Sequence, residues 1–90
     1  MINKLLVVTA LFLPVISFAH GNKASMTAAS IVVATEKFEK DYAAQLVNYT
    51  GVKGWPEGAK VQVKIYLTNS KVIGYSCHMM GTNVMCDRVN

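Results

Sequence analysis

The sequence predicts an α+β domain in which one amphipathic helix packs on a small antiparallel sheet, a hairpin or a three-stranded meander, held by one disulfide. Two patterns and the cysteine positions support this prediction. A stretch without proline or glycine has apolar residues at steps of three and four, and a later stretch alternates apolar with polar residues. The two cysteines lie nine positions apart near the end of the chain. A helix followed by consecutive strands is typical of the α+β class.

Residues 1–19 have the features of a secretory signal peptide. One lysine precedes a largely apolar run over residues 5–16, and residues 17–19 (SFA) have small side chains at the first and third places, as a cleavage site requires. A retained membrane anchor is the alternative, but it needs roughly 18–20 apolar residues, and this run is shorter and contains Pro14. We therefore expect cleavage after Ala19, export of the chain, and no stable membrane insertion afterwards.

The exported chain is expected to begin with a flexible polar arm, residues 20–26, and to continue as a helix over residues 27–48. Charged residues fall between the apolar positions of this second segment, which is the pattern of an amphipathic helix. Residues 30–35 (SIVVAT) also allow a short strand followed by a helix that Thr35 caps, because β-branched residues favour strands. We favour the continuous helix. Its apolar face would consist of Ile31, Ala34, Phe38, Tyr42, Leu46 and Tyr49.

The next segment, residues 50–58 (TGVKGWPEG), is dense in glycine and proline and is predicted to be a loop. Beyond it the chain alternates between apolar and polar side chains, as a half-buried strand does. The predicted order is a strand over residues 60–68, a tight turn at residues 69–70, a strand over residues 72–77, a turn over residues 79–83, and a tail, residues 84–89, too short to classify.

The two cysteines predict a disulfide if the chain is exported. An oxidising compartment favours disulfides in small domains, and with two cysteines only one pairing exists, Cys77 with Cys86. The pair would face across a hairpin in which Gly81 and Asn83 supply the permissive turn conformation. A disulfide is a large part of the stability of a domain this small.

The same region allows a second interpretation, a soft-metal site. The segment between the cysteines contains His78 and three methionines, and an amino-terminal histidine can chelate copper through its amine and its ring. Thioether ligands select Cu(I), yet methionine more often fills gaps in a small core. We therefore predict no metal and no other cofactor. A copper site remains the alternative, with His20, His78, Met79 and Met80 as candidate ligands.

Catalysis is not expected. No spacing would bring serine, histidine and aspartate together, and most acidic residues fall on the exposed helix face. The glycines of residues 51–58 follow a helix, whereas a phosphate-binding loop stands between a strand and a helix. The sequence therefore predicts a protein that is not an enzyme.

The formal net charge of +4 indicates a basic surface. Exported proteins seldom meet nucleic acid, so we expect an anionic lipid, lipopolysaccharide or an acidic protein as the partner of that surface. A solubilising face without a partner is the alternative. The lysines that would line one side of the hairpin are Lys53, Lys60, Lys64 and Lys71.

Residues 58–89 (GAKVQVKIYLTNSKVIGYSCHMMGTNVMCDRV) show an alternating strand, a tight turn, a second strand, a glycine at Gly81 and a cysteine at Cys86. In these features they resemble the C-terminal periplasmic domain of TolA, and residues 42–46 (YAAQL) resemble the helix that precedes the strands there. The resemblance implies that residues 27–90 form a TolA-like domain in the periplasm. It also implies a surface that docks other envelope proteins and that colicins and filamentous phages use for entry.

The chain departs from that family in its disulfide and in its length. The family's cysteine partner stands at the position of Val61, whereas this chain offers Cys77 on the next strand. The family's anchor, stalk and closing helix have no counterpart here, so we expect an uncovered sheet that adds a strand from an envelope, toxin or phage protein, or from a second copy. The predicted edge consists of Lys60, Val61, Gln62, Val63, Lys64, Ile65 and Tyr66.

These observations predict an interaction module, an adaptor or a decoy, in cell-envelope integrity and in colicin or phage import. Two other classes of function remain open. One is a secreted inhibitor or immunity-type binding protein with the same architecture, and the other is the copper-binding protein.

Overall fold

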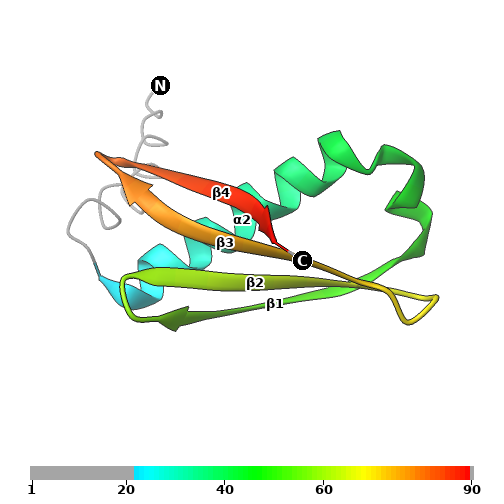
Figure 1. Cartoon of the computed structure of the whole chain (residues 1–90), viewed down its shortest axis with the longest axis horizontal. Helices are drawn as coiled ribbons and strands as arrows, with labels where there is room; N and C mark the ends of the chain where they lie inside the picture. Colours follow the sequence, from blue (N-terminus) through cyan, green and yellow to red (C-terminus); the bar gives the residue numbers. More distant parts are fainter. Residues whose placement is uncertain (1–21, 90) are drawn as a thin grey trace, which may run out of the picture.

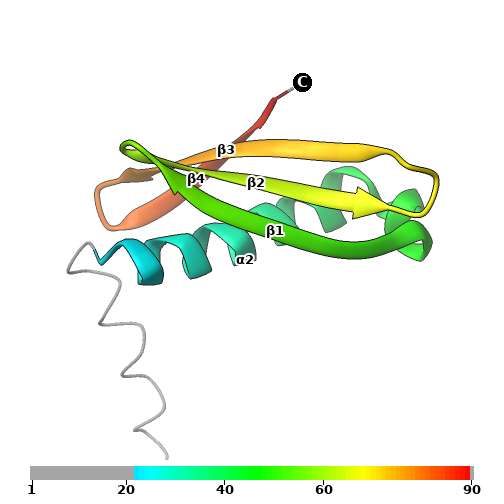
Figure 2. The ribbon, with the colours of Figure 1, turned by 90° about the horizontal axis from the view of Figure 1, so that it is seen from below.

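The computed structural model describes residues 22–89, and these form two layers. A helix, α2 (Lys23–Asp41), lies across one face of a four-stranded antiparallel sheet, and a short 3-10 helix, η2 (Ala43–Asn48), leads from it into the first strand. Figure 1 shows the sheet in front of the helix, and Figure 2 shows the two layers from the side. The predicted α+β class is confirmed. The predicted signal peptide lies outside the described residues.

The helix begins at Lys23, four residues before the predicted start at residue 27, and ends at Asp41, before the predicted end at residue 48. Asn22 caps it, since the side-chain oxygen accepts a hydrogen bond of 3.0 Å from the Ser25 N–H. The prediction of a loose arm over residues 20–26 is therefore wrong from Lys23 onward. The helix leaves α geometry at Tyr42, with φ −128° and ψ 45°. Residues 30–35 are helical, as favoured over the strand interpretation.

The four strands follow the helices in order along the sheet, each antiparallel to the next. The predicted alternation of the two central strands is confirmed, because every second side chain is buried under the helix. The predicted loop over residues 50–58 is wrong, because most of this segment is the first strand. The strands are β1 (Tyr49–Glu57), β2 (Lys60–Leu67), β3 (Val72–Met80) and β4 (Asn83–Val89).

The prediction that residues 60–66 form a free edge is also wrong. Strand β2 is internal, and it pairs with β1 on one side and with β3 on the other. For example, Gln62 lies opposite both Trp55 and Ser76. The edges of the sheet are β1 and β4, so any strand addition must take place there.

The turn between β3 and β4 is shorter than predicted. It consists of Gly81 and Thr82 alone, and the positive φ of Gly81, 66°, is the conformation that glycine adopts without steric cost. Met79 and Met80 therefore belong to a strand and not to a turn. The tail that the sequence left unclassified, residues 84–89, belongs to the last strand, β4.

The core lies between α2 and the sheet. Phe38 is completely buried on the helix side and Tyr75 is completely buried at the middle of β3. The predicted disulfide is confirmed, since Cys77 and Cys86 are directly opposite and bonded. The buried apolar residues are Ala34, Phe38, Val61, Val63, Ile65, Leu67, Ile73, Tyr75, Cys77 and Cys86.

Candidate functional site

The outer edge of β4 presents backbone groups that no other strand within residues 22–89 pairs. In an antiparallel pair, opposite residues that exchange no hydrogen bonds have Cα atoms about 4.5 Å apart, against about 5.5 Å for those that do. The Cα atoms of Cys77 and Cys86 are 4.0 Å apart, so this is a pair without mutual hydrogen bonds. Cys86 therefore directs its N–H and C=O outward. Because the direction alternates along a strand, Val84 and Arg88 do the same.

The other edge of the sheet, β1, is poorly suited to pairing with an added strand. The registers of β3 with β2 and of β2 with β1 extend the same alternation to this edge. They show that Val52, Gly54 and Pro56 direct their backbone groups away from β2. Proline has no N–H to offer a partner, and Lys53 beside them is exposed. Proline and lysine on an edge are known obstacles to strand pairing. The described part of β4 contains neither, so β4 is the better site for an added strand.

An apolar groove opens where α2 meets the tip of the β3–β4 hairpin. Its volume is about 320 Å³, and its floor is formed largely by methionine, alanine and valine side chains. Val32, on the rim, is 55% exposed although it is apolar. Val84 links the groove to the outer edge of β4. The lining residues are Met26, Ala28, Ala29, Val32, Val33, Met79, Thr82, Asn83 and Val84.

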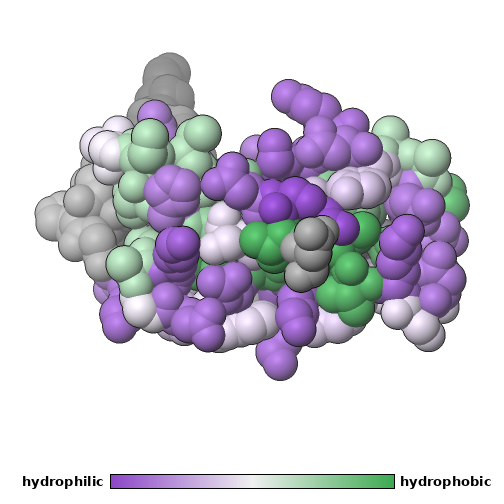
Figure 3. Space-filling model, in the orientation of Figure 1, coloured by the Kyte–Doolittle hydropathy of each residue, from purple (hydrophilic) through white to green (hydrophobic). Residues whose placement is uncertain are grey.

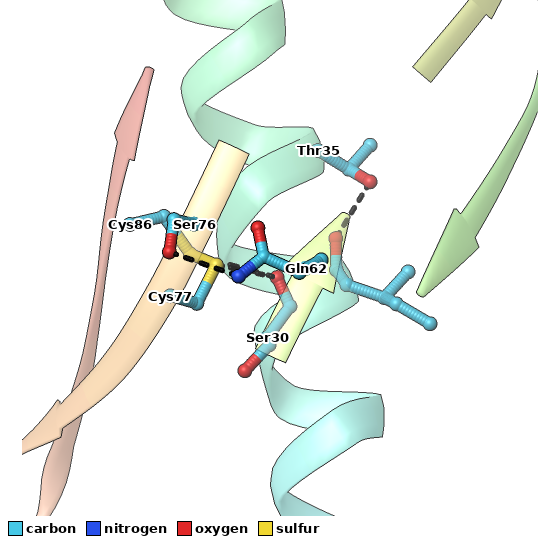
Figure 4. The surroundings of a disulfide bond; sticks show 7 residues. Ser30, Thr35, Gln62, Ser76, Cys77 and Cys86 are labelled. Carbon is cyan, nitrogen blue, oxygen red and sulfur yellow. Dashed lines mark hydrogen bonds between the residues drawn. A yellow bond between two sulfur atoms is a disulfide. The ribbon is translucent and has the colours of Figure 1, made fainter. Parts of the chain in front are cut away.

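The disulfide joins β4 to β3 directly above the helix, as Figure 4 shows. The sulfur atoms of Cys77 and Cys86 lie 3.9 and 3.7 Å from the backbone oxygen of Ser30. Disulfide sulfurs carry no proton, so we regard the dashed lines to this oxygen as van der Waals contacts; reduced thiols would be able to donate to it. The disulfide thus fixes the edge strand, and with it the groove, to the rest of the sheet.

The face of the sheet opposite the helix is mixed, with many hydrophilic residues around a smaller hydrophobic patch near its centre (Figure 3). It includes Trp55, whose ring centroid lies 5.5 Å from the Lys53 ammonium and 5.9 Å from that of Lys64, within range of cation–π attraction. Lys60 and Lys64 both lie on this face of β2. The fourth lysine of the predicted basic surface, Lys71, lies in the connection between β2 and β3.

The candidate copper ligands are not all brought together. His20 lies outside the described residues. Neighbouring residues on a strand point to opposite faces, so Met79 turns to the helix side, where it lines the groove, while His78 and Met80 share the helix-free face. Across residues 22–89, no group of three or more histidine, cysteine, aspartate or glutamate side chains is arranged to hold a metal ion.

Tyr75 is a buried core residue that has a polar hydroxyl group. Its hydroxyl has no hydrogen-bond partner among the described residues. Burial raises the pKa of the phenol, and the neighbouring Tyr42 and Asp41 raise it further, while Arg88 acts in the opposite direction. The side chain therefore stays neutral and acts as an apolar core residue.

Replacing Tyr75 with phenylalanine is expected to leave the free energy of unfolding at pH 7 unchanged, or to raise it by up to about 1 kcal/mol, because a buried hydroxyl without a partner is removed. The raised folded-state pKa means that the unfolded chain ionises first, so the native protein loses stability as pH rises above about 10. The variant lacks this loss. Urea unfolding at pH 7 and above pH 10 measures both effects, and a large loss in the variant at pH 7 would show that the hydroxyl is bonded.

No helix in the part of the chain that the structure describes is long and apolar enough to cross a membrane. Comparison with protein-family models, curated proteins and solved structures gave no match for this chain. The TolA resemblance therefore stays a prediction, and the functional argument rests on the β4 edge and the groove beside it.

Proposed function

We propose that the protein is an exported interaction module that binds an extended segment of a partner protein along β4. The observation that carries this proposal is the outward-facing backbone of Val84, Cys86 and Arg88 next to an apolar groove. In strand addition, backbone hydrogen bonds supply much of the affinity, and pockets for alternate side chains supply the specificity. The edge and the groove provide these two components side by side.

The expected partner is a protein of the cell envelope, or a toxin or phage protein that passes through it. The features of a signal peptide in residues 1–19 and the buried disulfide support a role in an oxidising compartment. The resemblance of residues 58–89 to the docking domain of TolA supports this class of partner. In such a role the protein acts as an adaptor, or as a decoy that occupies the partner's strand.

Capture of partners from a periplasmic extract, with the oxidised protein as bait, tests this proposal. Arg88→Pro removes an outward N–H without breaking a bond to β3, and Val32→Asp places a charge at the groove. Both variants are expected to stay folded and to lose the partner. The matched controls are Val52→Pro, which removes an outward N–H from β1, and Val47→Asp, at a position 87% exposed in η2. Both control variants are expected to capture the partner as the unaltered protein does.

Amide hydrogen exchange then locates the contact. Binding along β4 is expected to slow the exchange of the Val84, Cys86 and Arg88 amides and to leave those of Val52 and Gly54 unchanged. Protection at β1, or capture that survives both Arg88→Pro and Val32→Asp, would contradict the proposal. Protection of β4 amides by a second copy of this chain, at rising protein concentration, would identify a homodimer instead of an envelope partner.

A further inference from the structure

The helix-free face holds a cluster of soft-metal ligands that β3 and β4 bring together. His78 and Met85 are directly opposite partners in these strands, and directly opposite residues have Cβ atoms about 5 Å apart on the same face. Met80 follows His78 by two positions, which places it on that face too, about 6.5 Å along the strand. The three residues thus lie near one another on one face of the sheet, close to the β3–β4 turn, and their side chains are long enough to reach a common point.

The two methionines of this cluster are not core residues. Met80 is 55% exposed and Met85 is 47% exposed. By contrast, Met26 packs against the core and Met79 lines the groove on the helix side. Filling of gaps, the usual role of methionine, thus accounts for Met26 and Met79 but not for Met80 and Met85. Both side chains lie at the surface, on the same face of the sheet as His78.

We propose that His78, Met80 and Met85 form a binding site for a soft monovalent metal ion, Cu(I). Thioether sulfur selects Cu(I), and imidazole also suits copper. Because all three ligands are neutral, the site disfavours hard divalent cations, which prefer carboxylates. Asp87 and Lys60 line a shallow hollow that also includes His78, so one charge of each sign lies beside the cluster. The disulfide between Cys77 and Cys86 removes both thiolates as competing ligands and fixes the register that pairs His78 with Met85.

Metal titration of the oxidised, full-length mature protein tests the site. The probes are Ag(I), which imitates Cu(I) without redox chemistry, and Cu(I) delivered from a chromogenic chelator. With ¹³C-labelled methionine methyl groups, Ag(I) is expected to shift the signals of Met80 and Met85 and to leave those of Met26 and Met79 in place. The melting temperature is expected to rise with metal concentration, since the ion binds only the folded arrangement.

Leucine substitutions keep side-chain volume and remove the sulfur. Met80→Leu and Met85→Leu are each expected to weaken Cu(I) binding by a factor of roughly ten to a hundred or more, as is His78→Gln. Met79→Leu is the matched control, one residue away on the opposite face, and is expected to bind as the unaltered protein does. Equal affinity in Met80→Leu and Met85→Leu, an equal loss in Met79→Leu, or a loss caused only by His20→Ala would each overturn the site.

Discussion

Replacing Phe38 with alanine is expected to lower the free energy of unfolding by about 3–5 kcal/mol, the range for removal of a buried aromatic ring. The side chain has no exposed surface and belongs to the core between α2 and the sheet. Its centroid is 5.8 Å from that of Tyr42 and 6.3 Å from that of Tyr49. The ring therefore packs against both the end of the helix and the start of β1, so its loss weakens the contact between the layers.

A domain of this size has a total stability of only several kcal/mol, so the Phe38→Ala variant is expected to be near its unfolding midpoint at room temperature. Urea unfolding followed by far-ultraviolet circular dichroism measures the loss. Val47→Ala is the control, because this side chain is 87% exposed and its truncation is expected to change stability by less than about 0.5 kcal/mol. Similar losses in the two variants would mean that α2 does not dock on the sheet as described.

The sequence patterns identified the helix and the two central strands because those elements have one clearly buried face. Strand β1 was missed because the residues that suit it to its place are those that usually mark a loop. A Cβ atom on Gly54 would come within 2.6 Å of the Ile31 side chain, so any larger residue here would require that side chain to move where the helix approaches. Pro56 is tolerated because its nitrogen faces outward from the sheet. In this strand the glycine reflects close packing against the helix, and the proline reflects a position at the edge of the sheet.

The wrong prediction that residues 60–66 form a free edge has the same cause, which is that strand β1 was not recognised. Alternation of apolar and polar residues reveals which face of a strand is buried, but it is the same for an internal strand and an edge strand in an antiparallel sheet. With residues 50–58 taken as a loop, residues 60–66 had only one visible neighbour. Once β1 is in place, β2 is internal, and the free backbone groups lie on β4, which was too short to classify from its pattern.

The candidate sites required the register of β3 and β4, and the register depends on the turn. A turn over residues 79–83 would have removed Met79 and Met80 from the strands. The two-residue turn at Gly81 and Thr82 instead extends β3 to Met80 and aligns His78 with Met85. The sequence therefore supplied the ligand types and the disulfide pairing, whereas the assignment of each side chain to one face of the sheet needed the structure.

Replacement of both cysteines by alanine is expected to lower the free energy of unfolding by about 3 kcal/mol or more. In the chain-entropy model, a cross-link between residues nine positions apart accounts for roughly 2.7 kcal/mol. The alanine pair also removes two buried sulfur atoms, and a cavity in a core adds to the cost. The effect is expected to fall mainly on β4, because beyond the two-residue turn the disulfide is the covalent cross-link that holds this strand to β3.

A third form, the reduced native chain, separates these two contributions. Reduced Cys77 and Cys86 keep the buried volume, and their thiols can donate to the Ser30 oxygen that the sulfurs now contact. We therefore expect the stability order oxidised, then reduced, then alanine pair, with the first step larger, because it contains the cross-link. Urea unfolding of all three forms at pH 7, with thiol content measured in each, gives the order. If the reduced chain were as stable as the oxidised one, backbone pairing and helix packing alone would hold β4, and reduction would leave both the strand edge and the His78–Met85 pair intact.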